Sequence, residues 1–201
     1  SSNISYEDTM VLKESLGIPS DNAVLISIGR LGTEKNIGEL IRNFSELRKT
    51  RDNIYFVIVG GGPAEEELRA LSTSLNLDDR IIFTGMVKPD EVSKYYNLGD
   101  IFVCASTSET QGLTYIEAMA NFLPLVCRKD PCLDGVIIDD INGVQYTNSE
   151  EYVNAINAIF DHPSRQSSVA FYDKDHIENF SKKTFAENVY KLYEKVLSEE
   201  K

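Results

Sequence analysis

Short, uninterrupted runs of apolar residues constrain the fold of this 201-residue chain more than any other feature. Their residues are continuously apolar rather than alternating with polar ones. This pattern predicts strands covered on both faces, as in a parallel sheet between helices. The runs are VLISI (24–28), IYFVIV (54–59), IIF (81–83), IFVCA (101–105) and LPLVC (123–127).

Segments with helical spacing of apolar residues lie between and after these runs. In the clearest one, residues 37–47, five apolar residues share a face and Asn36 is expected to cap the helix start. With right-handed crossovers, the β-α order predicts an α/β fold, a Rossmann-like doubly wound parallel sheet with helices on both faces. The other predicted helices cover 64–76, 89–98, 113–121, 150–160 and a final stretch with Phe185, Val189, Leu192 and Val196.

The polar segment DHPSRQSS (161–168) is the best linker in the chain. It divides a Rossmann-like body over residues 1–160 from C-terminal helices over 161–201. Because an apolar stripe needs a partner, we expect these helices to pack back on the body or on a missing neighbour, within a single domain overall.

Composition and charge exclude several classes of protein. The chain is 42% hydrophobic and 26% charged, with no apolar run near 18 residues, so we expect a soluble domain with no membrane segment. A net charge of −12 argues against nucleic acid as a partner. The three cysteines, an odd number in or near apolar runs, predict thiols in a cytoplasmic protein, and two histidines without metal-ligand spacing predict no metal site.

The turns after the strands hold the candidate binding residues, because ligands of open parallel sheets bind outside the carboxyl ends of the strands. The turn GGGPAEEE (60–67) resembles a phosphate loop but matches neither dinucleotide nor Walker patterns. Its three glutamates already complement the helix dipole, which favours a structural role. Backbone contact with a base or ribose is the alternative.

The turn before residue 112 is the candidate anion site. Gly112, Leu113 and Thr114 open a helix that carries no acid before Glu117. Unpaired N–H groups and the positive end of the helix dipole favour an anion there.

Arg30 and Lys35, in GRLGTEKN (29–36), are candidate partners of the same anion. Taken singly, each is expected to be solvated or paired with Glu34 or Glu39. Because both cations are expected at the same edge of the sheet as the helix start without acidic residues, a diphosphate site is favoured instead.

Two glutamates, Glu109 and Glu117, flank the helix start with seven residues between them. A carboxylate accepts paired hydrogen bonds from vicinal hydroxyls, so carboxylates on both sides of a diphosphate suit a nucleotide sugar. The spacing by itself fits two exposed acids equally well.

Together these stretches resemble the C-terminal, nucleotide-binding domain of a GT-B glycosyltransferase of the GT4 family. The resemblance covers about residues 20–147, from VLISIGRLGTEKN through FVIVGGGP, IIFTGMV and DIFVCASTSETQGLTYIEAMA to GVIIDDINGVQY. The bacterial diacylglycerol glucosyltransferase branch of the family is the one most resembled by two stretches, SETQGLTYIEAMA and the later LPLVCRKDPCLDGVI.

The resemblance implies retaining, metal-independent transfer of a hexose from a nucleotide diphosphate sugar, expected to be a UDP-sugar, without a cofactor. It also implies a missing N-terminal domain that binds the acceptor, a lipid or a glycan. Arg30, Lys35 and Glu109 would be catalytic. Donor binding would involve Gly29, Arg30, Lys35 and the amides of Leu113 and Thr114 at the phosphates, Gly112 at the helix start, Glu117 at the ribose, Glu109 at the sugar, and Gly85, Met86 and Val87 at the base.

The chain departs from the family pattern at two places. Phe122 stands where the family usually has glycine, which predicts different packing after the helix. Thr110-Gln111 replaces the Gly-Phe that often follows the first glutamate, so the family pattern does not predict which sugar the donor carries. Two other functions compete with the glycosyltransferase. One is a stand-alone nucleotide-binding or regulatory module, and the other is an oxidoreductase, which the absence of G-x-G-x-x-G disfavours.

Overall fold

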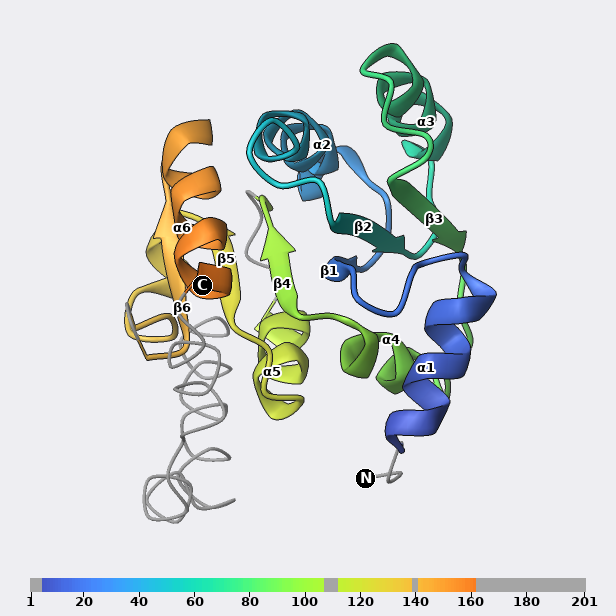
Figure 1. Cartoon of the computed structure of the whole chain (residues 1–201). Coiled ribbons are helices and arrows are strands. Elements are labelled where there is room, and N and C mark those ends of the chain that lie inside the picture. Colours follow the sequence, from blue (N-terminus) through green and yellow to red (C-terminus); the bar gives the residue numbers. More distant parts are fainter. Residues whose placement is uncertain (1–4, 107–111, 139–140, 162–201) are drawn as a thin grey trace.

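The structure of the chain, a computed structural model, describes residues 5–106, 112–138 and 141–161, with residues 112 and 113 described by backbone only. The described part contains a six-stranded sheet of order β3-β2-β1-β4-β5-β6 in which all neighbours pair in parallel (Figure 1). The predicted doubly wound fold is therefore confirmed. The strands are β1 (Ala23–Ile28), β2 (Ile54–Val59), β3 (Ile81–Gly85), β4 (Ile101–Cys104), β5 (Leu125–Arg128) and β6 (Gly143–Tyr146).

The strands of the sheet bury residues on both faces. Val24 and Leu25 are both fully buried but belong to different hydrophobic clusters, one on each side of β1. This two-sided burial explains why the central strands read as continuous apolar runs. Strand β6 was not predicted, because at the sheet edge Gly143–Tyr146 contains no such run and its two middle residues are only half-buried.

The helices cover both faces of this sheet. In Figure 1, α2 and α3 lie above the sheet, and α1, α4 and α5 lie below it. The hydrophobic clusters agree, since α2, α3 and α6 contribute to one cluster and α4 and α5 to the other. The helical elements are α1 (Tyr6–Ser15), η1 (Thr33–Lys35), α2 (Ile37–Leu47), α3 (Glu65–Ser74), α4 (Val92–Leu98), α5 (Gly112–Ala120), η3 (Pro131–Leu133) and α6 (Ser149–Asp161).

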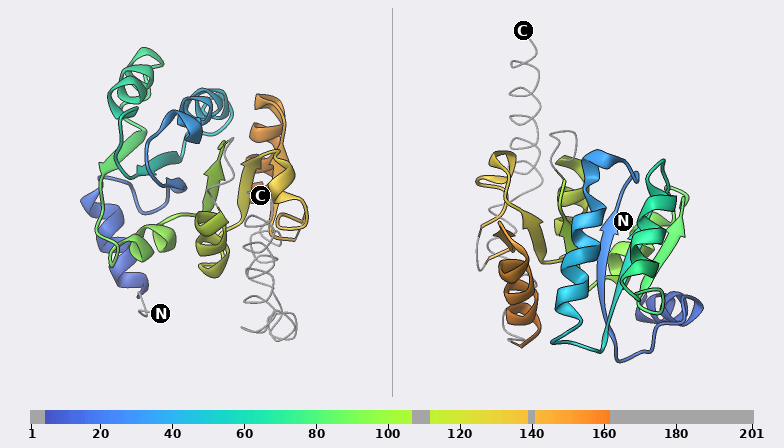
Figure 2. Two further views of the ribbon diagram at one scale, coloured as in Figure 1. Left: turned by 180° about the vertical axis from the view of Figure 1, so that it is seen from behind. Right: turned by 90° about the horizontal axis from the view of Figure 1, so that it is seen from above.

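Helix α1 was also not predicted. It buries no residue fully and has no apolar stripe, so its sequence lacks the helical signal. A capping box starts it, in which the Ser5 hydroxyl accepts from the Asp8 N–H and the Asp8 carboxylate accepts from the Ser5 N–H. The helix packs against α4, beside which it also lies in Figure 2.

The start of α2 corrects the expectation for Asn36. The residue occupies the N-cap position, but its backbone is left-handed, with φ of 49°, and its side chain makes no capping hydrogen bond. The Asn36 amide instead donates to Oε2 of Glu39 at 2.7 Å. The predicted capping role was therefore wrong.

The end of α5 shows what Phe122 does in place of glycine. The N–H of Leu123 donates to the carbonyl of Ala118, and the N–H of Phe122 donates to that of Met119. These are the two bonds of a Schellman motif, in which Phe122 holds the left-handed position with φ of 60°. Glycine normally favours this position, so Phe122 keeps a glycine-type turn and leaves its ring 56% exposed.

The described residues end with α6 at Asp161. The predicted helices over 161–201 therefore lie almost entirely outside the described residues, and the boundary at residue 160 remains a prediction. None of the helices in the described ranges is long and apolar enough to cross a membrane.

Candidate functional site

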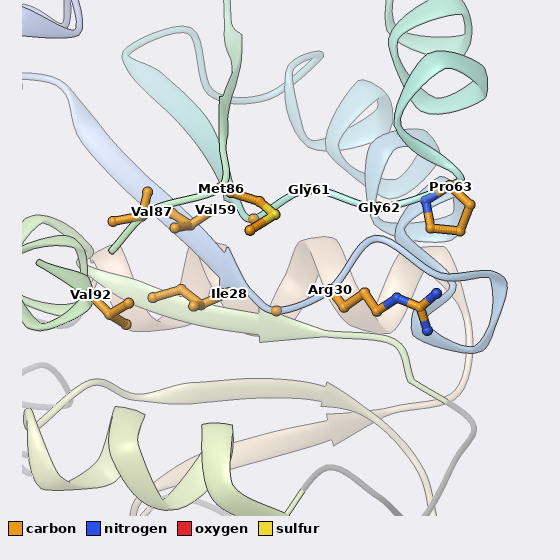
Figure 3. Close-up of a pocket in the computed structure, with 11 residues that line it drawn as sticks. Ile28, Arg30, Val59, Gly61, Gly62, Pro63, Met86, Val87 and Val92 are labelled. Atoms are coloured by element: carbon orange, nitrogen blue, oxygen red, sulfur yellow. The ribbon is translucent and has the colours of Figure 1, made fainter. Parts of the chain in front are cut away.

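A cavity of about 550 Å³ lies at the carboxyl ends of β1, β2 and β3. This is the edge of the sheet at which the sequence predicts the ligand, and the volume suits a nucleotide-sized molecule. Apolar side chains gather at one end of the cavity and Arg30 lies at the other, near Pro63 (Figure 3). The lining residues are Ile28, Gly29, Arg30, Val59, Gly60, Gly61, Gly62, Pro63, Met86, Val87 and Val92.

Backbone hydrogen bonds hold the three turns of the cavity together. The Gly29 N–H donates to the Val59 carbonyl at 2.9 Å, and the Gly60 N–H donates to the Gly85 carbonyl at 3.0 Å. Gly60 has φ of 127°, and a Cβ there would lie 2.0 Å from the Gly29 carbonyl oxygen. Only glycine allows this approach, so the glycines after the strands build the cavity.

Several cavity residues were missing from the predicted site. The turn of Gly60 to Pro63 was assigned a structural role, yet it lines the cavity. The alternative interpretation, backbone contact with a base or ribose, stays a prediction. Glycine directly after a buried strand was the available signal, but a plain tight turn gives the same signal. Ile28 and Val92 had no signal, because each looks like an ordinary core residue of its strand or helix.

The predicted base-contacting segment does reach the cavity. Met86 and Val87 line it, directly after Gly85, whose φ is 69°. The Met86 side chain is 88% exposed at the cavity mouth, whereas Val87 and Val92 are half-buried. A cavity end lined by apolar side chains is suited to a flat heteroaromatic ring.

Arg30 and Lys35 approach the site from the turn after β1. Arg30 is exposed and lines the cavity, and Lys35 is half-buried at the end of η1. The Ser106 hydroxyl donates to the Glu34 carbonyl at 2.9 Å, so this turn lies against the carboxyl end of β4. Partial burial lowers the pKa of Lys35, while the nearby Cys104 and Glu34 oppose that shift.

The alternative ion pairs of Arg30 and Lys35 with Glu34 or Glu39 are not formed within the described part of the chain. Glu39 pairs with Arg128 at 2.5 Å instead. The charge of Glu34 acts on Lys35 without a salt bridge between them. Arg30 thus lies at the cavity, whereas Lys35 lies beside Cys104 at the end of β4 and does not line the cavity, and their shared binding of an anion stays a prediction.

The start of α5 is as the sequence predicts it, since the helix begins at Gly112 and has no acid in its first turn. Glu117 is exposed on this helix, and its Oε2 accepts a hydrogen bond from the Tyr96 hydroxyl at 2.8 Å. Glu109 lies outside the described residues. The roles of Glu109 and of the Leu113 and Thr114 amides stay predictions.

Comparison with known proteins identifies the family of this chain. The family model "Glycosyl transferases group 1" matches residues 8–176. Alpha-monoglucosyldiacylglycerol synthase of Acholeplasma laidlawii is 35% identical over 192 residues, which are 96% of this chain and 48% of the relative. The synthase of the same name from Streptococcus pneumoniae (strain ATCC BAA-255 / R6) is 32% identical over 191 residues, 94% of this chain and 43% of the relative. The chain thus spans about half the length of these curated relatives.

Solved structures show the same fold. The pneumococcal O-GlcNAc transferase GtfA, in complex with UDP and GlcNAc, matches with a TM-score of 0.70 at 25% identity, over 96% of this chain and 44% of that one. Anabaena HepE, in complex with UDP and glucose, matches with a TM-score of 0.74 at 24% identity, over 83% of this chain and 46% of that one. Since the family match covers most of its length and the identity to a curated relative is 35%, the chain belongs to the group 1 glycosyl transferases.

Proposed function

We propose that this chain is the donor-binding domain of a retaining, metal-independent hexosyltransferase of the cytoplasm. It takes a hexose from a UDP-sugar and passes it to an acceptor, a lipid or a glycan, bound by a separate N-terminal domain. The observation that carries this proposal is the cavity at the carboxyl ends of β1 to β3, apolar at one end and cationic at Arg30.

The choice of UDP and of a lipid acceptor rests on the relatives. GtfA and HepE were each solved with UDP and a sugar, and the two synthases are named for a glucosylated diacylglycerol. The apolar end of the cavity, lined by Ile28, Val87 and Val92, suits the uracil ring.

The chemistry follows from where negative charge develops. As the bond between sugar and diphosphate breaks, charge accumulates on the leaving UDP, and groups that bind it more strongly in the transition state lower the barrier. Arg30 and Lys35 supply two positive charges, and the start of α5 supplies the amides of Leu113 and Thr114. In this proposal Glu117 holds the ribose and Glu109 positions the sugar.

Substitution of the two cations in the full-length enzyme tests the proposal. Arg30→Ala and Lys35→Ala should each reduce turnover of UDP-hexose about a hundredfold or more, the magnitude expected for losing a preorganised charge stabiliser. Lys49→Ala is the matched control, because Lys49 is an exposed cation that pairs with Glu46 at the end of α2. Wild-type turnover in both site variants would refute the assigned roles.

The isolated chain should bind donor weakly and transfer no sugar, since closure between two domains is expected to assemble the site. Sugar transfer catalysed by residues 1–201 alone would show that the acceptor is bound here as well.

A further inference from the structure

A buried tyrosine on α4 contacts the glutamate that the proposed function assigns to the ribose. Tyr96 is 2% exposed, and its hydroxyl donates to Oε2 of Glu117 at 2.8 Å. The same hydroxyl lies 3.5 Å from the Thr114 carbonyl oxygen, a much weaker contact. The hydrogen bond to Glu117 therefore links α4 to α5.

This hydrogen bond joins Glu117 to a helix that borders the cavity. Val92 lines the cavity and stands one helical turn before Tyr96 on α4. Residues four apart share a helix face, so Tyr96 lies on the same side of α4 as Val92, although Tyr96 itself does not line the cavity. Through Tyr96, the Glu117 carboxylate is tied to the same helix face that borders the apolar end of the cavity.

The ring of Tyr96 is fixed by its aromatic neighbours. It packs on Phe102 with ring centroids 6.2 Å apart, and Phe102 packs edge-to-face on Tyr115 at 6.2 Å. A ring held in this way places its hydroxyl at one point, unlike the flexible side chain of an exposed glutamate.

The hydrogen bond also has a fixed direction. Burial, and then the Glu117 carboxylate, raise the pKa of Tyr96 well above its ordinary value, so the phenol stays protonated and donates. Within the described residues, no hydrogen bond reaches Oε1 of Glu117. The Tyr96 hydroxyl thus holds one oxygen of this carboxylate, and no described residue holds the other.

We propose that Tyr96 is a positioning residue that orients Glu117 to accept the ribose hydroxyls of the nucleotide. This inference rests on the proposed function. Tyr96 does not touch the nucleotide itself, and it acts only through the carboxylate of Glu117.

Titration calorimetry of the full-length protein with UDP and with 2′,3′-dideoxy-UDP tests this role. The wild type should bind UDP about tenfold more tightly than the analogue, since hydrogen bonds to a charged group are lost with the hydroxyls. Tyr96→Phe should weaken UDP binding about tenfold and change binding of the analogue by less than about twofold. A protein whose Tyr96 had only a packing role would lose affinity for both ligands alike.

Two further variants control this measurement. Tyr115→Phe removes another buried hydroxyl of the same cluster, one that contacts Cys104 at 3.3 Å, and should leave the ratio of the two affinities unchanged. In a Glu117→Ala background, Tyr96→Phe should cause no further loss of UDP affinity, because the two residues act as one unit. Thermal melting of each variant accompanies the titrations, and the phenylalanine keeps the ring packing of the core.

Equal weakening of both ligands by Tyr96→Phe, or unchanged UDP affinity, would overturn the positioning role while leaving the proposed function intact. A wild-type protein that does not bind UDP would overturn the proposed function and this inference with it.

Discussion

Substitution of Phe122 should change the free energy of unfolding by an amount that follows from its backbone conformation. It holds a left-handed backbone, φ 60°, at the end of α5. That conformation costs a residue with a Cβ about 1–2 kcal/mol, and glycine avoids the cost. Glycine also has more conformational freedom to lose on folding, which offsets about 0.5–1 kcal/mol. Both Phe122→Gly and Phe122→Ala lose the ring, so their comparison isolates the backbone.

We expect Phe122→Gly to be more stable than Phe122→Ala by about 0.5–1 kcal/mol. Urea unfolding followed by circular dichroism should show the difference as a shift in midpoint of about 0.3–0.5 M. The matched control is Ala70→Gly, at an exposed position inside α3, where glycine should instead cost about 1 kcal/mol.

The refuting result is an alanine variant at residue 122 that is as stable as the glycine variant or more so. Phe122 would then occupy an ordinary right-handed or extended conformation, and the Schellman motif at the end of α5 would be wrong.

Two other predictions concern the cavity. Gly60→Ala should lower the free energy of unfolding, measured in urea, by about 2 kcal/mol or more, because the added Cβ meets the Gly29 carbonyl. The control Gly17→Ala, where φ is 71° and the space is open, should lower it by only about 1 kcal/mol. Equal losses in the two variants would contradict the close packing of the turns. UDP affinity should fall as pH rises through the Lys35 pKa, which burial sets below the ordinary value of about 10.4, because the ammonium that attracts the diphosphate is lost there. Lys35→Arg, always charged, should keep its affinity over the same pH range, and a parallel fall in that variant would exclude Lys35 as the titrating group.

Much of the fold could be predicted because the physics is local and repetitive. A strand buried on both faces must be apolar at consecutive positions, and the sequences of β1, β2 and β4 have this pattern. β6 and α1 escaped prediction because neither buries a continuous or periodic apolar surface. β6 is placed by pairing with β5, and α1 is placed by packing on α4. These contacts cannot be predicted from the residues of either segment alone.

The site was predictable to the extent that topology decides it. The carboxyl ends of parallel strands meet at one edge, and this rule led to the turns that contain Arg30 and residues 84–89. The roles of Gly29 and of the segment from Gly85 to Val87 came from the resemblance to the GT4 family, and Gly29, Met86 and Val87 do line the cavity. The glycines from Gly60 to Gly62 were missed because φ and close approach cannot be read from the letter G. The contact between Tyr96 and Glu117 depends on two helices lying side by side, for which the sequence carries no pattern.

The central claim is that Arg30 and Lys35 bind the diphosphate of a nucleotide. Titration calorimetry with UDP and uridine, on the wild type and on a variant carrying Arg30→Ala and Lys35→Ala together, tests it most directly. We expect the wild type to bind UDP about a hundredfold more tightly than uridine, and the double variant to reduce this difference to less than about tenfold. A double variant that keeps the wild-type difference between UDP and uridine would contradict the claim.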